Sequence, residues 1–358
     1  MVEANTTTSK MIYRYLGNSG LRVSVLSWGN WINGKDESEN AKTIKVALEN
    51  GINFFDTAEI YAFGLAEISL GKAFKELNVR RESIVVSTKI LKSGLGVNDC
   101  LLSRKHIIEG LKNSLKRLQL DYVDVVFCHR YDEITPIEEV VRAMNYCIEN
   151  GLAHYWSTSE WKGSQIMEAF AVCERYGLIK PISDQCQYNM MERRKVEDEY
   201  THLFDRHNYG TTVWSPLFSG VLTGKYIEKP KVEGSRFDVF ENEARLHKMK
   251  YFNNKEAWDK KILELTEIAK ELNATMPQLA LAWVIRNPNV STCIMGTSKT
   301  EQLIENLKAL EIAEQIDSKI EARIEKILGN GPDPELNWRT FEFKPPRRLD
   351  FIEKNKFI

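Results

Sequence analysis

The sequence lacks the features that mark membrane, secreted and nucleic-acid-binding proteins. No apolar run approaches the roughly 18 to 20 residues that a membrane-spanning helix needs, and the first ten residues, MVEANTTTSK, contain no apolar segment of a secretory signal. The 49 lysines and arginines nearly balance the 50 aspartates and glutamates, so no strong field attracts nucleic acid or an anionic membrane. We therefore expect a cytoplasmic protein that binds no nucleic acid and does not insert into a membrane.

The sequence also lacks paired cysteines. Its six cysteines include no CxxC pair, and most of them lie in apolar runs. These residues are Cys100, Cys128, Cys147, Cys173, Cys186 and Cys293. The pattern indicates reduced, half-buried thiols, and it argues against disulfide bonds and against a metal centre.

What the sequence does have is a regular alternation of short apolar runs and amphipathic segments. Eight runs predict strands at 23–31, 52–58, 83–90, 122–129, 153–159, 181–188, 211–215 and 290–296. Alternating strands and helices with short connections predict a parallel sheet. Eight such units favour a (β/α)8 TIM barrel, and no GxGxxG motif follows any strand to favour the alternative, an open doubly wound sheet.

Helix boundary residues support the predicted helices between these strands. Residues 136–151 repeat apolar side chains at helical spacing, with Pro136 suited to the first turn and Gly151 to the residue after the last. Ser103 is the expected N-cap of a second helix, and Tyr209-Gly210 is expected to end a third. The strand pattern and the helix boundaries therefore predict the same alternation.

Three segments fall outside the repeat. Residues 11–23 predict a β-hairpin that turns at 18–20 and could close one end of the barrel. Residues 217–253 predict a long loop, which in compact domains is usually functional or disordered. We expect a flexible stretch at 1–10, the barrel at 11–328, and an extension at 329–358 whose Trp338, Phe341 and Phe343 suggest packing against the protein or a partner.

Ionisable side chains stand at the ends of three consecutive predicted strands. Asp56 ends one strand, Lys89 the next and His129 the third, and Tyr61 follows five residues after Asp56. Taken singly, these could be an N-cap or loop carboxylate, a lysine reaching to solvent and a hydrogen-bonded core histidine. Taken together, they would share one pocket, because neighbouring strands lie only about 4.8 Å apart and catalytic groups of such barrels lie at the carboxyl ends of the strands.

This set of residues suits proton donation to a carbonyl oxygen. A free tyrosine is a poor acid at neutral pH, but a nearby ammonium such as that of Lys89 stabilises the phenolate. Asp56 would hold the lysine in place, His129 would bind the oxygen, and Tyr61 would act as general acid. No serine or cysteine with a partnered base provides a nucleophile, so the pattern favours hydride transfer from a cofactor.

Two later loops could bind the phosphates of such a cofactor, as loops after the seventh and eighth strands of barrels often do. Residues 214–226 offer hydroxyls, glycine amides and Lys225, and residues 296–306 place Gly296 and Ser298 at the start of a helix, where an anion is favoured. The alternative for the second loop is an ordinary helix cap by Ser298 or Thr300.

These motifs closely resemble those of the aldo-keto reductases. The resemblance rests on FFDTAEIYAFGLAEISLG, STKI, SRKHIIEGLKNSLKRLQLDYVDVVFCHR, TPIEEVVRAMNYCIENGLAHYWSTSEW, WSPLFSGVLTGKY and GTSKTEQLIEN, and it runs from about Met11 to Gly329. Within that superfamily the chain is most similar to the voltage-gated potassium channel β-subunit group, with plant-type features. The resemblance implies a (β/α)8 barrel that binds NADPH.

By that resemblance, Asp56, Tyr61, Lys89 and His129 match the catalytic tetrad. The residues that match cofactor-binding positions are Asn30, Trp31, Asp56, Ser159, Gln185, Trp214, Ser215, Pro216, Leu217, Ser219, Lys225, Arg236, Gly296, Ser298, Gln302, Glu305 and Asn306. Among them, Ser159 and Gln185 match residues that hold the nicotinamide carboxamide, and Trp214 matches the aromatic that stacks on its ring. Arg236 and Lys299 are the cations that would favour NADPH over NADH.

Two positions depart from the animal channel subunits. These carry asparagine at the position of His129, so the histidine favours carbonyl reduction over a purely sensing role. They carry arginine at the position of Glu160, where glutamate is the plant-type residue. The aromatics near the predicted substrate loops, Trp28, Trp31, Tyr131 and Trp161, indicate an apolar substrate without specifying its class.

Three functions follow as hypotheses. The first is an NADPH-dependent oxidoreductase that reduces small aldehydes and ketones to alcohols. The second is a cofactor-binding regulatory β-subunit, as a homotetramer, of a voltage-gated potassium channel α-subunit. The third is a barrel isomerase or hydrolase without a nicotinamide cofactor.

Overall fold

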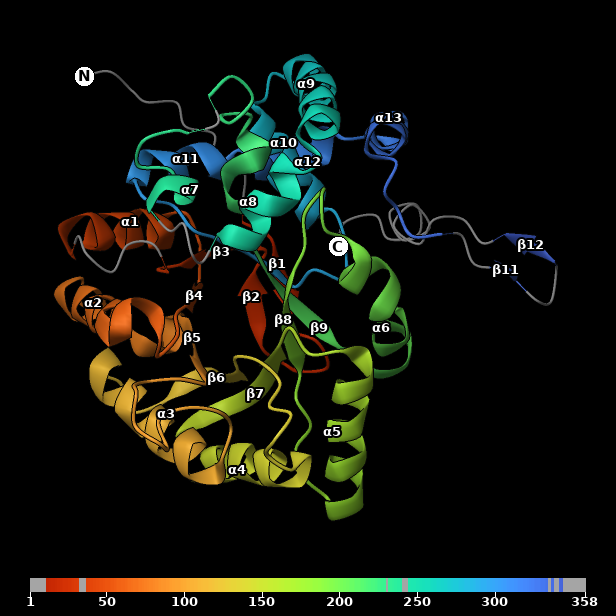
Figure 1. Ribbon diagram of the computed structural model, residues 1–358. Coiled ribbons are helices and arrows are strands. Elements are labelled where there is room, and N and C mark those ends of the chain that lie inside the picture. Colours follow the sequence, from red (N-terminus) through yellow and green to blue (C-terminus); the bar gives the residue numbers. More distant parts are fainter. Residues whose placement is uncertain are drawn as a thin grey trace.

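Eight parallel strands close into a barrel in the order β10-β3-β4-β5-β6-β7-β8-β9 (Figure 1). The computed structural model describes residues 11–31, 37–229, 231–239, 244–333, 336–337 and 341–343. The strands are β3 (Leu26–Gly29), β4 (Phe54–Asp56), β5 (Val85–Ile90), β6 (Val123–Cys128), β7 (Ala153–Ser159), β8 (Ser183–Gln187), β9 (Gly210–Trp214) and β10 (Thr292–Met295). Each lies within or overlaps one of the eight predicted runs, so the prediction of a TIM barrel is confirmed.

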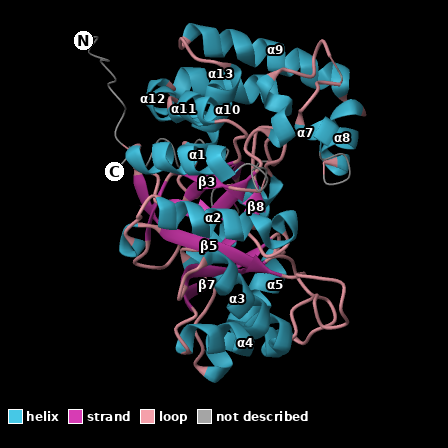
Figure 2. Cartoon of the chain, turned by 90° about the vertical axis from the view of Figure 1, so that its left-hand side faces the viewer, coloured by secondary structure: helices cyan, strands magenta, loops and turns pink. Residues whose placement is uncertain are grey.

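Helices surround the barrel on its outer side (Figures 1 and 2). They are α1 (Glu37–Glu49), α2 (Leu65–Glu76), α3 (Arg104–Leu118), α4 (Ile137–Glu149), α5 (Gly163–Tyr176), α6 (Thr201–His207), α9 (Lys255–Glu271), α10 (Met276–Ile285), α11 (Thr300–Leu307), α12 (Ala309–Gln315) and α13 (Ser318–Leu328). As predicted, the Ser103 side chain caps α3 by accepting a hydrogen bond from the His106 amide. One predicted helix end is wrong: Asn208, in the left-handed conformation at φ 49°, ends α6, and Gly210 already begins β9.

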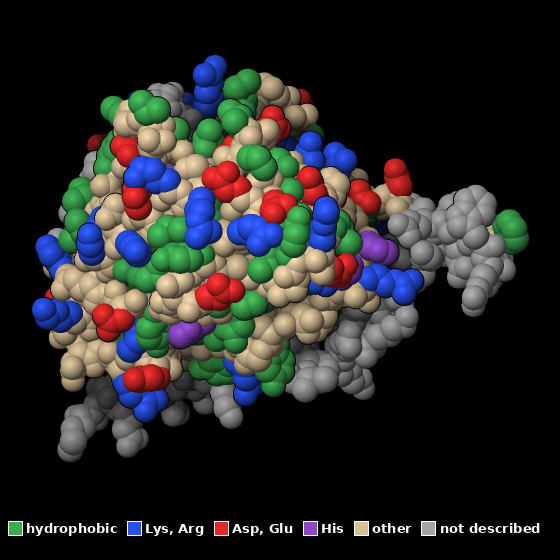
Figure 3. Space-filling model, turned by 90° about the horizontal axis from the view of Figure 1, so that it is seen from below, with side chains coloured by type: hydrophobic (Ala, Val, Ile, Leu, Met, Phe, Trp, Pro, Cys, Tyr) green, Lys and Arg blue, Asp and Glu red, His purple; other side chains and the backbone are tan. Residues whose placement is uncertain are grey.

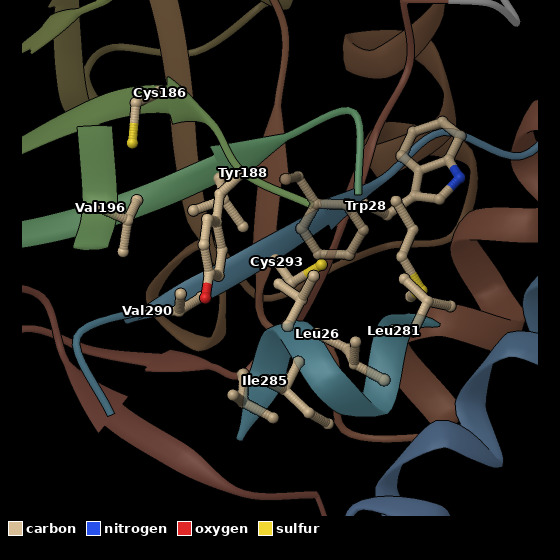
Figure 4. Close-up of a cluster of buried hydrophobic side chains, with 14 of the residues drawn as sticks. Leu26, Trp28, Cys186, Tyr188, Val196, Leu281, Ile285, Val290 and Cys293 are labelled. Carbon is tan, nitrogen blue, oxygen red and sulfur yellow. The ribbon is translucent and has the colours of Figure 1, made fainter. Parts of the chain in front are cut away.

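Alternation along the strands separates two apolar layers. Outward-facing residues pack against the helices; for example, Leu281 and Ile285 of α10 lie beside Leu26 of β3 and Cys293 of β10 (Figure 4). Inward-facing residues form a separate cluster inside the barrel, which includes Phe54 and Val85. The same alternation places Asp56 on the side of Phe54 and Lys89 on the side of Val85, so both ionisable groups point into the barrel.

A β-hairpin closes the amino-terminal end of the barrel. Strands β1 (Tyr13–Tyr15) and β2 (Arg22–Ser24) pair antiparallel, as predicted. Leu16 has no exposed surface and belongs to the same interior cluster as Phe54. Arg14 donates hydrogen bonds to carbonyl oxygens of Ile285, Asn287 and Val290, and it thereby satisfies the carboxyl end of α10.

The segment predicted to be a long loop contains short helices instead. A 3-10 turn, η4 (Phe218–Thr223), is followed by α7 (Arg236–Val239) and α8 (Arg245–Phe252). Each of α7 and α8 has one buried residue, Phe237 and Tyr251 respectively, so their sequence carries a weak periodic signal. We call residues 231–239 and 244–252 the flap.

Little of the carboxyl-terminal extension is described. The structure includes β11 (Leu336–Asn337) and β12 (Glu342–Phe343), which pair antiparallel, and Phe341, whose side chain is 73% exposed. The expected packing of the extension against the protein or a partner stays a prediction. Trp338, the side chain of Phe343 and the expected flexible stretch 1–10 lie outside the described residues.

The described surface carries charges of both signs. Seen from below, lysine and arginine side chains alternate with aspartate and glutamate, and hydrophobic groups lie between them (Figure 3). In the described part of the chain, no helix has the length and apolar character to cross a membrane.

The hairpin generates a prediction about stability. Leu16→Ala would leave a cavity beneath the interior cluster and should lower the free energy of unfolding by about 2 to 5 kcal/mol. Tyr15→Ala is the matched control, because Tyr15 is 62% exposed and such a change usually costs less than about 0.5 kcal/mol. Urea denaturation followed by circular dichroism measures both, and equally small effects would contradict the role of the hairpin.

Candidate active site

Asp56 and Lys89 form a buried ion pair at the carboxyl end of the barrel. Lys89 Nζ lies 2.5 Å from Asp56 Oδ2, with Lys89 completely buried. Adjacent strands fix this contact, because Asp56 pairs in register with Ser87 and Lys89 lies two residues further along β5. The hydroxyl of Ser87 donates to the other carboxylate oxygen of Asp56 at 2.7 Å. Sequence reasoning missed Ser87, although its spacing of two from Lys89 places both on one face of the strand.

The ion pair keeps the lysine charged. Burial alone would lower the pKa of Lys89, but the nearby Asp56 and Tyr61 outweigh burial and raise this pKa above its ordinary value. Lys89 Nζ also donates to the carbonyl of Thr57 at 2.7 Å and to the Tyr61 hydroxyl at 3.2 Å. The Lys89 ammonium therefore contacts three oxygen atoms of the site. One of these is the hydroxyl of Tyr61, the predicted proton donor.

A strained turn presents Tyr61 to this lysine. Tyr61 begins the 3-10 turn η1 (Tyr61–Gly64), in which Ala62 and Phe63 have φ values of 48° and 55°. Non-glycine residues rarely adopt this left-handed conformation, and such strain concentrates at functional sites. The turn returns the Tyr61 ring to the pocket, where its centroid lies 5.8 Å from that of His129.

The surroundings of His129 disfavour its protonated form. Burial, together with the positive charges of Lys89 and Arg130, lowers its pKa well below the ordinary value of 6.5. Its Nδ1 is buried and has no hydrogen-bond partner within the described chain. The half-buried imidazole lies beside Tyr61 and its protonated form is disfavoured, so it suits binding of an uncharged carbonyl oxygen.

Three further residues connect the ion pair to strands β7 and β8. Gln185 Nε2 donates to Asp56 Oδ1 at 3.0 Å, and Ser159 Oγ donates to the Gln185 carbonyl at 2.9 Å. Arg130 Nη1 in turn donates to Ser159 Oγ at 3.1 Å. The structure thus brings Ser159 and Gln185, both predicted from the resemblance, next to the predicted tetrad.

Many of the predicted cofactor-binding residues line one cavity of about 610 Å³. They are Ser215, Pro216, Leu217, Ser219, Lys225, Arg236, Gly296, Ser298, Gln302, Glu305 and Asn306. Asn30, Trp31, Asp56, Ser159, Gln185 and Trp214 are not among the residues that line this cavity. A volume of this size lies within the range of roughly 300 to 1,000 Å³ typical of ligand sites.

The cavity contains two cations without an acidic partner. Burial and the charge of Arg236 lower the pKa of Lys225, and burial lowers the pKa of Arg236 to about 10. No carboxylate of the described residues pairs with either side chain. Gly220 lies directly against the Lys225 ammonium, because a Cβ there would come within 2.7 Å of Nζ. Lys225 is exposed and Arg236 half-buried, and their like charges disfavour each other. This end of the cavity therefore fits an anionic, phosphate-bearing ligand.

The loop between β9 and Lys225 is also strained. Ser215, Phe218 and Ser219 have φ values of 53°, 46° and 54°. These conformations turn the backbone at the predicted phosphate site, and Asn189 holds the turn by donating to the Ser215 carbonyl.

The second predicted loop leads into α11. Gln302 Oε1 accepts hydrogen bonds from the amide and hydroxyl of Ser298, and Glu39 of α1 accepts from the amide of Thr300. Neither Ser298 nor Thr300 caps the helix with its own side chain, so the alternative of an ordinary cap is wrong.

Aromatic residues predicted near the substrate divide into two groups. Trp31 contacts the Tyr61 ring edge-on at a centroid distance of 6.5 Å, and the Arg236 guanidinium lies 4.5 Å from the Trp31 ring. Tyr131 is also partly exposed, whereas Trp28 and Trp161 have no exposed surface and belong to the outer core. The prediction that all four line the substrate site is therefore wrong for Trp28 and Trp161.

His247 of the flap is a site residue that sequence reasoning missed. Its ring lies parallel to Trp214, at a centroid distance of 5.7 Å and an angle of 17°, and its Nδ1 lies 2.7 Å from Ser219 Oγ. The residue follows no strand and no motif, so no sequence signal indicates it.

Comparison with known proteins places these features in context. Residues 25–328 match the sequence profile of the Aldo/keto reductase family. A rice protein (Oryza sativa subsp. japonica) named "Probable voltage-gated potassium channel subunit beta" is 46% identical over 335 residues, which is 92% of this chain and all of the relative. A protein of the same name from Arabidopsis thaliana has the same identity and coverage. These relatives agree with the resemblance to the channel β-subunit group.

The environment of His247 predicts a pH-dependent stability. Burial and the charges of Arg236 and Lys250 lower its pKa from 6.5 to about 4. In the unfolded chain the His247 side chain is protonated as the pH falls below about 6.5, whereas in the folded chain it is protonated only near pH 4. Protonation of the unfolded chain lowers its free energy, so the free energy of unfolding is highest above pH 6.5 and falls as the pH falls from 6.5 towards 4. Between pH 7 and 5, wild type should lose up to about 2 kcal/mol relative to His247→Gln. Urea unfolding at both pH values measures this difference, and a constant difference would contradict the prediction.

Proposed function

The chain belongs to the aldo/keto reductase family, and from this premise we propose that it is an NADPH-dependent oxidoreductase that reduces aldehydes and ketones to alcohols. The observation that carries the proposal is the position of Lys89, whose ammonium contacts both Asp56 and the Tyr61 hydroxyl. The alternative of an isomerase or hydrolase without a nicotinamide does not by itself account for Lys225 and Arg236, which have no carboxylate partner among the described residues.

Each member of the tetrad has a separate task in this proposal. The His129 imidazole and the Tyr61 hydroxyl bind the carbonyl oxygen of the substrate. Tyr61 donates its proton to that oxygen, and the Lys89 ammonium stabilises the phenolate that remains. Asp56 keeps Lys89 charged and holds it at the end of β5. NADPH supplies the hydride when it is bound.

The remaining residues hold the cofactor. Ser159 and Gln185 would bind the carboxamide and Trp214 would stack on the nicotinamide, while Asn30 and Trp31 match positions of the first strand that line the pocket. Lys225 and Arg236 pair with phosphates, and Lys299 with Ser298 and Gln302 surrounds the adenosine and its 2′-phosphate. The strained loop at Ser215 and Ser219 directs backbone groups to the pyrophosphate.

The first prediction of this proposal concerns the proton donor. Tyr61→Phe removes the hydroxyl and should lower kcat for a nitrobenzaldehyde by at least about 100-fold, because general acid catalysis contributes about 10²- to 10⁴-fold. NADPH oxidation followed by absorbance at neutral pH measures the loss. Cofactor binding, followed by quenching of tryptophan fluorescence, should remain close to wild type.

Asp56→Asn removes the negative charge of the ion pair and leaves the Tyr61 hydroxyl in place, so it tests the ion pair apart from the proton donor. The variant retains the shape of the side chain and should fold, but it leaves Lys89 without its counter-charge, so turnover near neutral pH should fall strongly. Wild-type turnover in Asp56→Asn would reduce this residue to a structural role. A protein that binds no NADPH would instead support the isomerase or hydrolase alternative.

A second candidate function follows from the names of the two plant relatives. We propose as the alternative that the chain is a regulatory β-subunit, assembled as a homotetramer, that docks on the cytoplasmic part of a voltage-gated potassium channel α-subunit. Sedimentation analysis should then give a tetramer, and a purified channel cytoplasmic domain should capture the protein. Monomeric behaviour would count against this function, and it would leave the reductase proposal intact.

A further inference from the structure

Glu160 follows Ser159 in the chain and its side chain contacts Trp214, and the proposed function assigns it no role. It lies directly after the end of β7, and its backbone adopts the left-handed conformation at φ 59°. The strained conformation is held by its amide, which donates to the Gln185 carbonyl and to Asp184 Oδ1, both at 3.1 Å. A strained and doubly held backbone indicates that the direction of this side chain matters.

The carboxylate of Glu160 connects the ends of three neighbouring strands. Its Oε1 accepts a hydrogen bond from the Gln187 amide at 2.6 Å, at the end of β8. The same oxygen accepts from Trp214 Nε1 at 2.8 Å, at the end of β9. Its Oε2 lies 3.2 Å from Lys195 Nζ. The side chain is 19% exposed, so these contacts are shielded from water in large part.

Lys195 is itself held in place. It begins the π-helical turn η3 (Lys195–Glu199), a rare conformation that often marks functional sites. Its ammonium also donates to the Trp161 carbonyl at 2.8 Å, so the cation is anchored to the loop that carries Glu160. Lys195 therefore holds Oε2 of the Glu160 carboxylate, while the Trp214 indole donates to Oε1.

These contacts restrict the Trp214 ring. The hydrogen bond from Nε1 fixes the rotation of the indole about its side-chain bonds, and His247 covers one of its faces. The other face of the Trp214 indole is therefore held in one orientation. An aromatic ring that must stack on a planar ligand binds more tightly when its orientation is set in advance, because less conformational freedom is lost on binding.

We infer that Glu160 is a positioning residue that orients Trp214 for stacking on the nicotinamide ring. The inference rests on the proposed function, because it presupposes a nicotinamide cofactor. Glu160 acts through Trp214 and not by contact with the cofactor, so its effect is confined to ligands that reach Trp214.

The test compares two ligands by isothermal titration calorimetry. NADP+ contains the nicotinamide, whereas 2′,5′-ADP contains only the adenosine end with its 2′-phosphate. Glu160→Leu should weaken NADP+ binding by about tenfold, as expected for loss of a hydrogen bond to a charged group, and should change 2′,5′-ADP binding by less than about twofold. Glu160→Gln keeps an acceptor oxygen and should restore most of the NADP+ affinity.

A double-mutant cycle identifies the route of the effect. Trp214→Phe keeps an aromatic ring but has no indole N–H, so Glu160→Leu in this background should change NADP+ affinity by less than about twofold. Glu174→Leu is the control, since Glu174 also pairs with a lysine, Lys180, but lies on the outer helix α5. This control should bind both ligands like wild type.

The outcomes separate this inference from the proposed function. A tenfold loss that persists in the Trp214→Phe background, or no loss in either background, would overturn the positioning role. Wild-type protein that binds neither ligand would overturn the proposed function itself. If Glu160→Leu does not fold, Glu160→Asp provides the same comparison, because it keeps the charge but is one methylene too short to reach the indole.

Discussion

The buried ion pair between Asp56 and Lys89 is the interaction on which the site depends. A lysine without exposed surface inside a barrel would lose its charge if it had no partner, and a neutral amine could not stabilise a phenolate. The pair is possible because strands β4 and β5 are adjacent and both side chains face inward. Gln185 and Ser87 satisfy the remaining oxygen of Asp56, so the carboxylate has little freedom to turn away from the lysine.

The opposite end of the pocket has the reverse electrostatic character. Lys225 is exposed and Arg236 is half-buried. The two cations lie near each other and have no carboxylate partner in the described structure, and the nearby loop is held in strained backbone conformations. The two positive charges repel each other, and an anionic ligand between them would offset this repulsion. At the catalytic end the charge of Lys89 is balanced by Asp56, whereas at the phosphate end the charges of Lys225 and Arg236 would be balanced by an anionic ligand. Trp214, which contacts both Glu160 and His247, lies between the catalytic end and the phosphate end.

Much of this arrangement could be predicted from residues alone. The strands were predictable because most of them lie in short runs rich in apolar residues between helical patterns, which is a local property of the chain. The meeting of Asp56, Lys89 and His129 followed from one topological rule, that parallel strands end at the same edge. The errors occurred where the local signal is ambiguous. Trp28 and Trp161 were expected near the substrate because aromatic residues suit both a pocket and a core, and only the direction of each side chain separates the two.

The sequence by itself determined the fold class, the family and the residue types at the strand ends, because these depend on periodicity and on contiguous motifs. Only the tertiary structure decided the partners of Glu160, the contact of His247 with Trp214 and the surroundings of Arg236, with which no carboxylate of the described residues pairs. Such contacts join residues far apart in the chain; Gln185 and Asp56, for example, are separated by 129 positions. Their geometry is set by the closure of the barrel and by the packing of the flap, and no local pattern in the chain encodes either.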